Sequence, residues 1–355
     1  MSNQNTLSTA EILNLYKELE IVHGDGDAGA FLFGWQCRNP FSGDLIEATI
    51  ARSKSYDYVP YAYMEDDRDL SNKVKDMHAC FGERAPEHVF CASSGASSVL
   101  FTFCAWLSKS GIKEVYYIPP IYFTMLNALH LFGIRARPIS ARHAFESDFT
   151  LNLPAKESVL ILADPVWYVG IPIKEETINE LVAWQKNTGS FIFVDGSFQY
   201  MPWDGHISEP TSNFDPSRTI RLVSPTKSLA VNGYRFAYAT IPVNLSSEFK
   251  NLYTNIYGSG PTDNIAFAYE AIEAMKARSL TDKLIGSAKD RHVELRSRGV
   301  ISSPFNPRCG YFAYEQLNYK LPDGYIKMDG KYFGQFRFPD HVRINLLSPS
   351  QNVIQ

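Results

Sequence analysis

The stretch Leu222-Val-Ser-Pro-Thr-Lys-Ser-Leu-Ala-Val-Asn-Gly-Tyr-Arg235 decides how the rest of the chain is interpreted. Its apolar, strand-like beginning ends at Ser224, and Lys227 follows three residues later in a predicted turn that contains Pro225. A lysine at a strand end can form a Schiff base with a carbonyl cofactor if its surroundings deprotonate the amine. Ser224 and Arg235 can hold a phosphate by charge-assisted hydrogen bonds. The alternative is a lysine on a surface loop, where most lysines lie.

Strands and helices alternate on both sides of this stretch. Apolar runs predict strands at 88–92, 114–118, 134–139, 159–162, 191–194 and 220–223, and helices at 69–81, 99–107, 122–132 and 177–185. This alternation predicts an α/β fold with a mostly parallel sheet, right-handed crossovers and helices on its faces. Beyond about residue 248, helices at 263–278 and 281–298 and strands at 309–314 and 341–346 predict a smaller α+β domain. We expect an N-terminal arm (1–45), a large domain (46–248) and a small domain (249–355).

The composition excludes several classes of protein. A net charge of −4 over 355 residues gives no basic surface for nucleic acid or membranes. No apolar run approaches the roughly 20 residues that span a bilayer. The five cysteines lack metal-ligand spacing, and the polar first residues do not resemble a signal peptide, so we expect reduced thiols, no metal and a cytoplasmic protein.

Several polar residues follow predicted strands, and in a parallel sheet such positions converge on one edge. Gly95, Ala96 and Ser97 lie in a small-residue turn before a helix, where backbone amides bind phosphate. Asp195 ends a buried strand, which makes it a candidate for a functional carboxylate. Arg343, on an otherwise apolar strand, suits a substrate carboxylate, with a structural salt bridge as the alternative.

The order of these residues resembles the aminotransferases of fold type I, which use pyridoxal 5′-phosphate (PLP). The matching residues are Gly95, Tyr122, Asp195, Ser224, Lys227, Arg235 and Arg343. The resemblance implies that Lys227 carries the cofactor, Tyr122 stacks on its ring, and Asp195 pairs with the ring nitrogen. It also implies a homodimer with composite active sites, to which Tyr61 or Tyr63 and the segment 257–260 would contribute.

Two residues depart from the pattern of that family. Trp167 stands where aminotransferases usually have an asparagine that contacts the phenolic oxygen of the cofactor, and Phe198 stands where a tyrosine is expected. Both hydrogen bonds to that oxygen are then lost, which puts ordinary transamination in doubt. We count Trp167 among the residues expected to contact the cofactor.

The N-terminal segment from Leu7 to Asp25 resembles the lid of PLP-dependent arginine oxidases of enduracididine biosynthesis. Relatives of these enzymes include capreomycidine synthase and the cyclodehydratase of guanitoxin biosynthesis. Of these types, this chain resembles the cyclodehydratase most. The resemblance implies a natural-product lyase that closes γ-hydroxyarginine to L-enduracididine. His23 would be its acid or base, and the substrate-binding candidates would be Ser8, Glu11, Asp25, Asp27 and Arg343.

Three alternatives to the cyclodehydratase remain: an arginine oxidase, an aminotransferase and a non-catalytic binding module. An arginine oxidase would consume dioxygen, and an aminotransferase would need an α-keto acid, whereas a cyclodehydratase needs neither. A non-catalytic binding module of the same fold is less favoured, because Lys227 is intact and no DNA-binding motif accompanies it.

Overall fold

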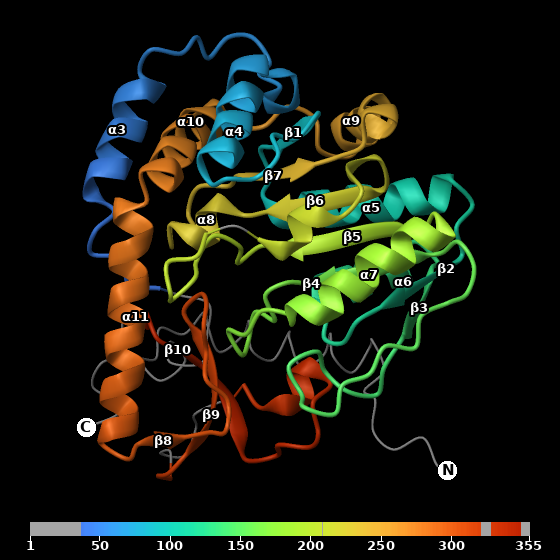
Figure 1. The fold of residues 1–355 in the computed structure, drawn as a ribbon. Helices are drawn as coiled ribbons and strands as arrows, with labels where there is room; N and C mark the ends of the chain where they lie inside the picture. The colour runs from blue at the N-terminus through green and yellow to red at the C-terminus, as the bar shows by residue number, and fades with distance from the viewer. Residues whose placement is uncertain (1–36, 208, 321–327, 349–355) are drawn as a thin grey trace.

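A seven-stranded sheet forms the centre of the molecule (Figure 1). The computed structural model describes residues 37–207, 209–320 and 328–348. The strand order is β1-β7-β6-β5-β4-β2-β3, and every pairing is parallel except those that β7 makes with β1 and β6. The strands are β1 (Val89–Ala92), β2 (Glu114–Tyr117), β3 (Arg135–Pro138), β4 (Val159–Ala163), β5 (Phe191–Gly196), β6 (Thr219–Val223) and β7 (Ala237–Thr240). The predicted α/β class with a mostly parallel sheet is therefore confirmed.

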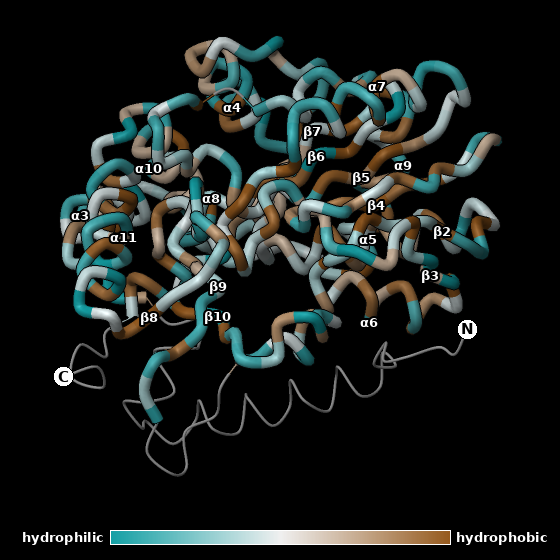
Figure 2. Tube along the Cα trace, turned by 60° about the horizontal axis from the view of Figure 1, so that its bottom comes forward, coloured by the Kyte–Doolittle hydropathy of each residue, from teal (hydrophilic) through white to brown (hydrophobic). Residues whose placement is uncertain are grey.

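Helices cover both faces of the sheet because its central strands are apolar on both sides. One face packs against α5 (Ala96–Lys109), α6 (Phe123–Leu131) and α9 (Ser246–Tyr257). The other face packs against α4 (Arg68–Cys80), α7 (Glu175–Thr188) and α10 (Thr262–Ala277). The brown segments of Figure 2 follow these buried strands through the middle of the molecule.

A smaller unit follows the long helix α11 (Ser279–Ser297). Its antiparallel sheet contains β8 (Ile301–Ser302), β9 (Phe312–Leu317) and β10 (His341–Asn345), in the order β10-β9-β8. The register pairs Arg343 with Tyr314. Helix α3 (Gly43–Ser53) packs against α10. Short 3-10 helices occur at Met64–Asp66, Pro210–Asn213, Pro216–Arg218, Val243–Leu245 and Gly330–Phe333, the last labelled η5. None of the helices in the described ranges is long and apolar enough to cross a membrane.

The structure differs from the predicted elements in a few places. Lys227 lies in the short helix α8 (Pro225–Ser228) rather than in an open turn, because Pro225 at its first position has the φ angle that a helix needs. The sequence did not predict α3, α9 or β7, whose Ala-Tyr-Ala-Thr sequence carries a weak strand signal. Strand β9 begins three residues later than predicted, at Phe312.

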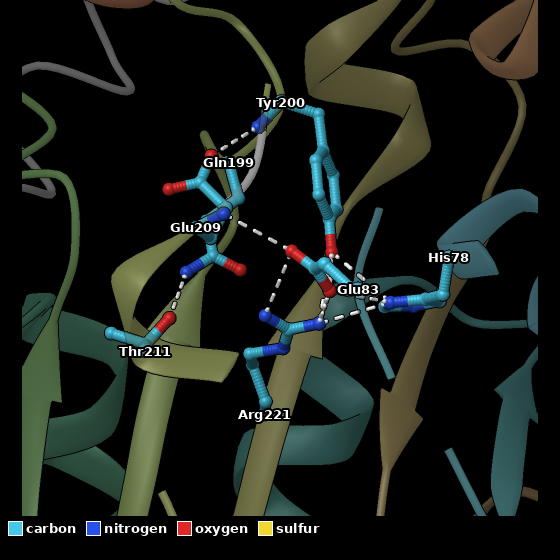
Figure 3. Close-up of polar contacts among 7 residues, drawn as sticks. All are labelled: His78, Glu83, Gln199, Tyr200, Glu209, Thr211 and Arg221. Atoms are coloured by element: carbon cyan, nitrogen blue, oxygen red, sulfur yellow. Dashed lines mark hydrogen bonds and ion pairs between the residues drawn. The ribbon is translucent and has the colours of Figure 1, made fainter. Parts of the chain in front are cut away.

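A buried ion pair connects three segments of the large domain (Figure 3). Arg221, in the middle of β6, forms an ion pair with Glu83, which follows α4. Tyr200, after β5, donates to Glu83 at 3.0 Å, and Nδ1 of His78 lies 2.8 Å from the same carboxylate. Burial alone would raise the pKa of Glu83, but the hydrogen bond with His78 and the charge of Arg221 lower it to about 2. The carboxylate is therefore ionised, and it neutralises a buried arginine.

We expect Glu83→Gln to lower the free energy of unfolding by about 3–5 kcal/mol, because it leaves the Arg221 charge buried without compensation. Urea unfolding at pH 7 measures this loss. The matched control is Glu87→Gln, which removes an exposed ion pair with Arg84 and should cost at most about 1 kcal/mol. Equal losses in the two variants would contradict the structural role assigned to the buried pair.

Candidate active site

A pocket opens where β4, β5 and β6 end, next to the N-terminus of α5. It holds about 660 Å³ of empty space, part of it open to solvent. Its lining residues are Ala96, Ser97, Leu100, Tyr122, Pro165, Trp167, Asp195, Ser197, Phe198, Ser224, Thr226, Lys227 and Arg235. Most of the cofactor-binding residues expected from the sequence therefore surround one cavity.

One end of the pocket suits a phosphate. Gly95 has φ +78° and precedes α5, whose first residues, Ala96 and Ser97, line the cavity. A Cβ atom at Gly95 would lie 2.9 Å from Nη2 of Arg235, so only glycine allows the guanidinium to lie so close to this helix start. Helix amides and an arginine together form a typical anion site. Ser224, whose Oγ lies 3.1 Å from Oγ1 of Thr226, lines the same cavity.

An amide side chain bridges the two halves of this phosphate site, which the pairing of β1 with β7 already brings together. Nδ2 of Asn264 donates to the carbonyl of Ser93 at 2.8 Å, and its Oδ1 accepts from the backbone N–H of Arg235 at 3.2 Å. The hydroxyl of Tyr253 accepts from the N–H of Ser94 at 3.1 Å. Sequence reasoning missed Asn264 and Tyr253, because they lie in helices 171 and 159 residues after the residues that they contact in this turn.

Lys227 lies at the pocket wall with its amine largely removed from water. Burial, helped by the positive charges of Arg235 and Arg343, lowers the pKa of Lys227 to about 8, whereas Cys37 acts in the opposite direction. An amine with this pKa is partly deprotonated near neutral pH and can attack a carbonyl group. The expected role of Lys227 therefore has a physical basis in its surroundings.

Asp195 is the second-last residue of the buried strand β5 and lines the same pocket. Its Oδ1 accepts hydrogen bonds from the backbone N–H and the hydroxyl of Ser197, at 3.1 and 2.6 Å. Burial raises the pKa of Asp195, and the two bonds from Ser197 oppose that shift. A cationic group next to this carboxylate would favour its ionised form, which suits a protonated ring nitrogen. Sequence reasoning did not identify Ser197, although it lies only two residues from Asp195.

Three aromatic residues of the pocket wall, Tyr122, Trp167 and Phe198, pack edge to face against their neighbours. Tyr122 and Trp167 meet edge to face, with ring centres 5.7 Å apart. Phe198 packs edge to face against Tyr311 and Phe312 and brings no hydrogen-bonding group to the cavity. The two departures noted in the sequence, Trp167 and Phe198, thus both lie at the pocket wall.

Arg343 is fully buried in β10 of the small sheet. The carbon at the centre of its guanidinium lies 4.4 Å from the ring centre of Phe312 and 5.5 Å from that of Trp167. Cys37 lies nearby, with its Sγ 3.6 Å from Nδ2 of Asn345. Burial raises the pKa of Cys37, and the charges of Lys227 and Arg343 are among the effects that oppose it. Cys37, which the sequence suggested only as a reduced thiol, therefore lies close enough to both cations to feel their charge.

The lid residues lie outside the described part of the chain. Ser8, Glu11, His23, Asp25 and Asp27 belong to residues 1–36. Their roles in substrate binding and proton transfer stay predictions.

Comparisons with known proteins agree with this geometry. The family model for aminotransferase class I and II matches residues 61–352. No curated protein matches the sequence. Among solved structures, aspartate aminotransferase from Thermotoga maritima is similar with a TM-score of 0.75 and 14% identity, over 99% of this chain and 96% of that one. A probable N-succinyldiaminopimelate aminotransferase from Thermus thermophilus has a TM-score of 0.71 and 16% identity, over 97% of both chains.

A third structure, an Escherichia coli protein with a methionine aminotransferase function, has a TM-score of 0.72 and 14% identity, over 96% of this chain and 95% of that one. At these identities the structures establish the fold alone, whereas the family model covers most of the chain. The chain therefore belongs to the aminotransferase class I and II family, which uses pyridoxal 5′-phosphate as its cofactor.

Proposed function

We propose that this protein is a PLP-dependent aminotransferase that acts on the α-amino group of an amino acid. The observation that carries the proposal is the convergence of Lys227, Asp195 and Arg235 on one pocket, with the pKa of Lys227 lowered to about 8. Family membership supports the cofactor, and the buried arginine on β10 supports a carboxylate-bearing substrate.

Each group of pocket residues would hold a different part of the cofactor. The amides of Ala96 and Ser97, with Ser224 and Arg235, would bind the phosphate of the cofactor. Asp195 would hold the proton on the ring nitrogen, and Tyr122 would fix the plane of the ring. Bound PLP supplies an electron sink that weakens the bonds at Cα of the amino acid.

The substrate would be held and deprotonated by residues of both units. Arg343 would bind the α-carboxylate through the N–H groups at the edge of its guanidinium. Lys227 would then remove the proton from Cα and afterwards release it, acting first as base and then as acid. Its lowered pKa suits this exchange, because a base with a pKa near the working pH both accepts and releases a proton readily.

A second candidate is the dehydration and ring closure of γ-hydroxyarginine to L-enduracididine. It is favoured by Trp167 and Phe198, which replace the usual asparagine and tyrosine at the pocket wall. Here the γ-hydroxyl would leave with a proton as water, and a guanidine nitrogen would bond to Cγ, so no electrons are exchanged with a second substrate. His23 would be the acid or base for this step, with the guanidinium bound by Glu11, Asp25 or Asp27.

The products of the purified holoprotein separate these functions. Incubation with a panel of L-amino acids and 2-oxoglutarate or pyruvate should give a keto acid and a new amino acid by mass spectrometry, with no oxygen consumed. Loss of one water from γ-hydroxyarginine without any keto acid would replace the first candidate by the second. Oxygen uptake with L-arginine alone would instead identify an arginine oxidase.

Lys227 is expected to be the residue that carries PLP. Treatment of the holoprotein with sodium borohydride should fix the cofactor on the peptide that contains Lys227, as detected by mass spectrometry. Lys227→Met should give no labelled peptide and no turnover. The control Lys186→Met changes an exposed lysine of α7 and should label as the wild type does. A label on any other lysine would exclude the assignment.

The low pKa of Lys227 also predicts a change in stability with pH. In the cofactor-free protein, the unfolded lysine holds its proton up to pH 10.5, whereas the folded one loses it near pH 8. Lys227 therefore costs stability below pH 8, and this cost disappears as the pH rises to about 10.5. Lys227→Met should raise the free energy of unfolding by about 1–3 kcal/mol at pH 7 and by little at pH 10.5. A gain that does not depend on pH would contradict the shift.

We further propose that the protein is a homodimer with composite active sites. The segment before Met64 exposes a row of large side chains, among them Tyr58, Val59 at 93% exposure and Tyr61 at 82%. Such a patch suits a protein interface. Val59→Asp should shift the protein from dimer to monomer in sedimentation experiments, whereas the control Val243→Asp, at another exposed valine, should not. A monomeric wild type would refute the proposal.

A further inference from the structure

We propose that Trp167 is a positioning residue that sets the plane of the Arg343 guanidinium and connects it to the aromatic wall of the cofactor pocket. The inference rests on the proposed function of Arg343 as the carboxylate-binding residue. It assigns a specific task to the tryptophan that stands in place of the usual asparagine.

Trp167 touches both halves of the candidate site. Its ring is only 6% exposed and lies 5.7 Å, centre to centre, from Tyr122 on the cofactor side. On the other side, the guanidinium carbon of Arg343 lies 5.5 Å from its ring centre. The ring also meets Phe333 of the small unit edge to face, at 5.3 Å. One indole therefore joins a residue of the large domain to two residues that follow α11.

The position of the indole is itself fixed by its surroundings. The next residue, Tyr168, stacks on Phe333 with ring centres 4.2 Å apart and planes 10° apart. The hydroxyl of Tyr168 lies 2.7 Å from Nδ1 of His143. Gly170, with φ +70°, lets the chain turn back where a Cβ would lie 2.7 Å from the carbonyls of Cys309 and Phe312. The loop after β4 is thus anchored to the small unit by the residues that directly follow Trp167.

The contact with Arg343 has a physical effect on carboxylate binding. The guanidinium carbon lies within cation–π distance of the ring centres of both Phe312 and Trp167, so both rings attract its charge. Aromatic faces engage the guanidinium without using its N–H groups, which stay directed outward in its plane. The fixed plane reduces the rotational freedom that a carboxylate would otherwise have to remove on binding.

A pair of cofactor conjugates tests this inference without knowledge of the natural substrate. N-(5′-phosphopyridoxyl)-L-alanine carries a carboxylate, and N-(5′-phosphopyridoxyl)ethylamine lacks it. Each is titrated into the full-length cofactor-free protein by calorimetry or fluorescence. The ratio of the two dissociation constants reports the contribution of the carboxylate alone, and the affinity of the ethylamine conjugate reports an intact ring and phosphate site.

We expect the wild type to bind the alanine conjugate at least about tenfold more tightly than the ethylamine conjugate, since charge-assisted hydrogen bonds contribute at least about 1.4 kcal/mol. Trp167→Leu should reduce this ratio about fivefold or more, and Trp167→Phe, which keeps an aromatic face, about threefold or less. Any contact that Trp167 makes with the cofactor part is lost for both conjugates alike, so it cancels in the ratio. The control Trp184→Leu removes a buried tryptophan of α7 whose Nε1 donates to the Pro154 carbonyl, and it should leave the ratio unchanged.

A double-mutant cycle separates positioning from general packing. Arg343→Met should bring the ratio of the two dissociation constants to about one. Adding Trp167→Leu to that variant should not change the ratio further. An unchanged ratio in Trp167→Leu, or equal losses with and without Arg343, would overturn the inference while the carboxylate role of Arg343 stands. A normal ratio in Arg343→Met would instead refute that part of the proposed function.

Discussion

The parallel pairing of β4, β5 and β6 is the constraint on which the candidate site depends. Its register places Ala163 beside Asp195 and Gly196 beside Val223, so the three strands end side by side. The residues that follow each strand therefore enter the same space, although Trp167 and Lys227 lie 60 residues apart in the sequence. A shift of one residue in either pairing would turn Asp195 to the other face of the sheet and separate it from the pocket.

The charges of the site are balanced differently from those of the core. Arg221 has an ionised carboxylate, Glu83, as a permanent partner within the protein. In the pocket, Arg235 forms no ion pair with any described residue, and its Nη1 donates to the backbone carbonyl of Asn232. Among the described residues that line the pocket, Asp195 is the one acid, beside the basic residues Lys227 and Arg235. The phosphate of PLP would pair with Arg235 by charge-assisted hydrogen bonds.

The fold and the residues with distinctive chemistry could be predicted from the sequence. Lys227, Asp195 and the glycine turn at Gly95 each lie at or just after the end of a strand that an apolar run identifies. Parallel strands place such residues at one edge of the sheet. Asn264, Tyr253 and Ser197 could not be predicted, because an ordinary polar residue in a helix or loop carries no signal of the group it contacts. The antiparallel strand β7 was missed for a similar reason, since its alanines favour no strand by themselves.

Asn264 makes one part of the phosphate site depend on a helix that is synthesised after the whole seven-stranded sheet. Its amide joins Ser93, near the first third of the chain, to Arg235, and it belongs to α10, which packs against α3 and α4. In a chain synthesised only as far as β7, the pairing of β1 with β7 could already set Ala92 beside Ala237 and so bring the two phosphate-binding segments together. The later docking of α10 adds the Asn264 amide, which bridges Ser93 and Arg235 and fixes the two segments to each other.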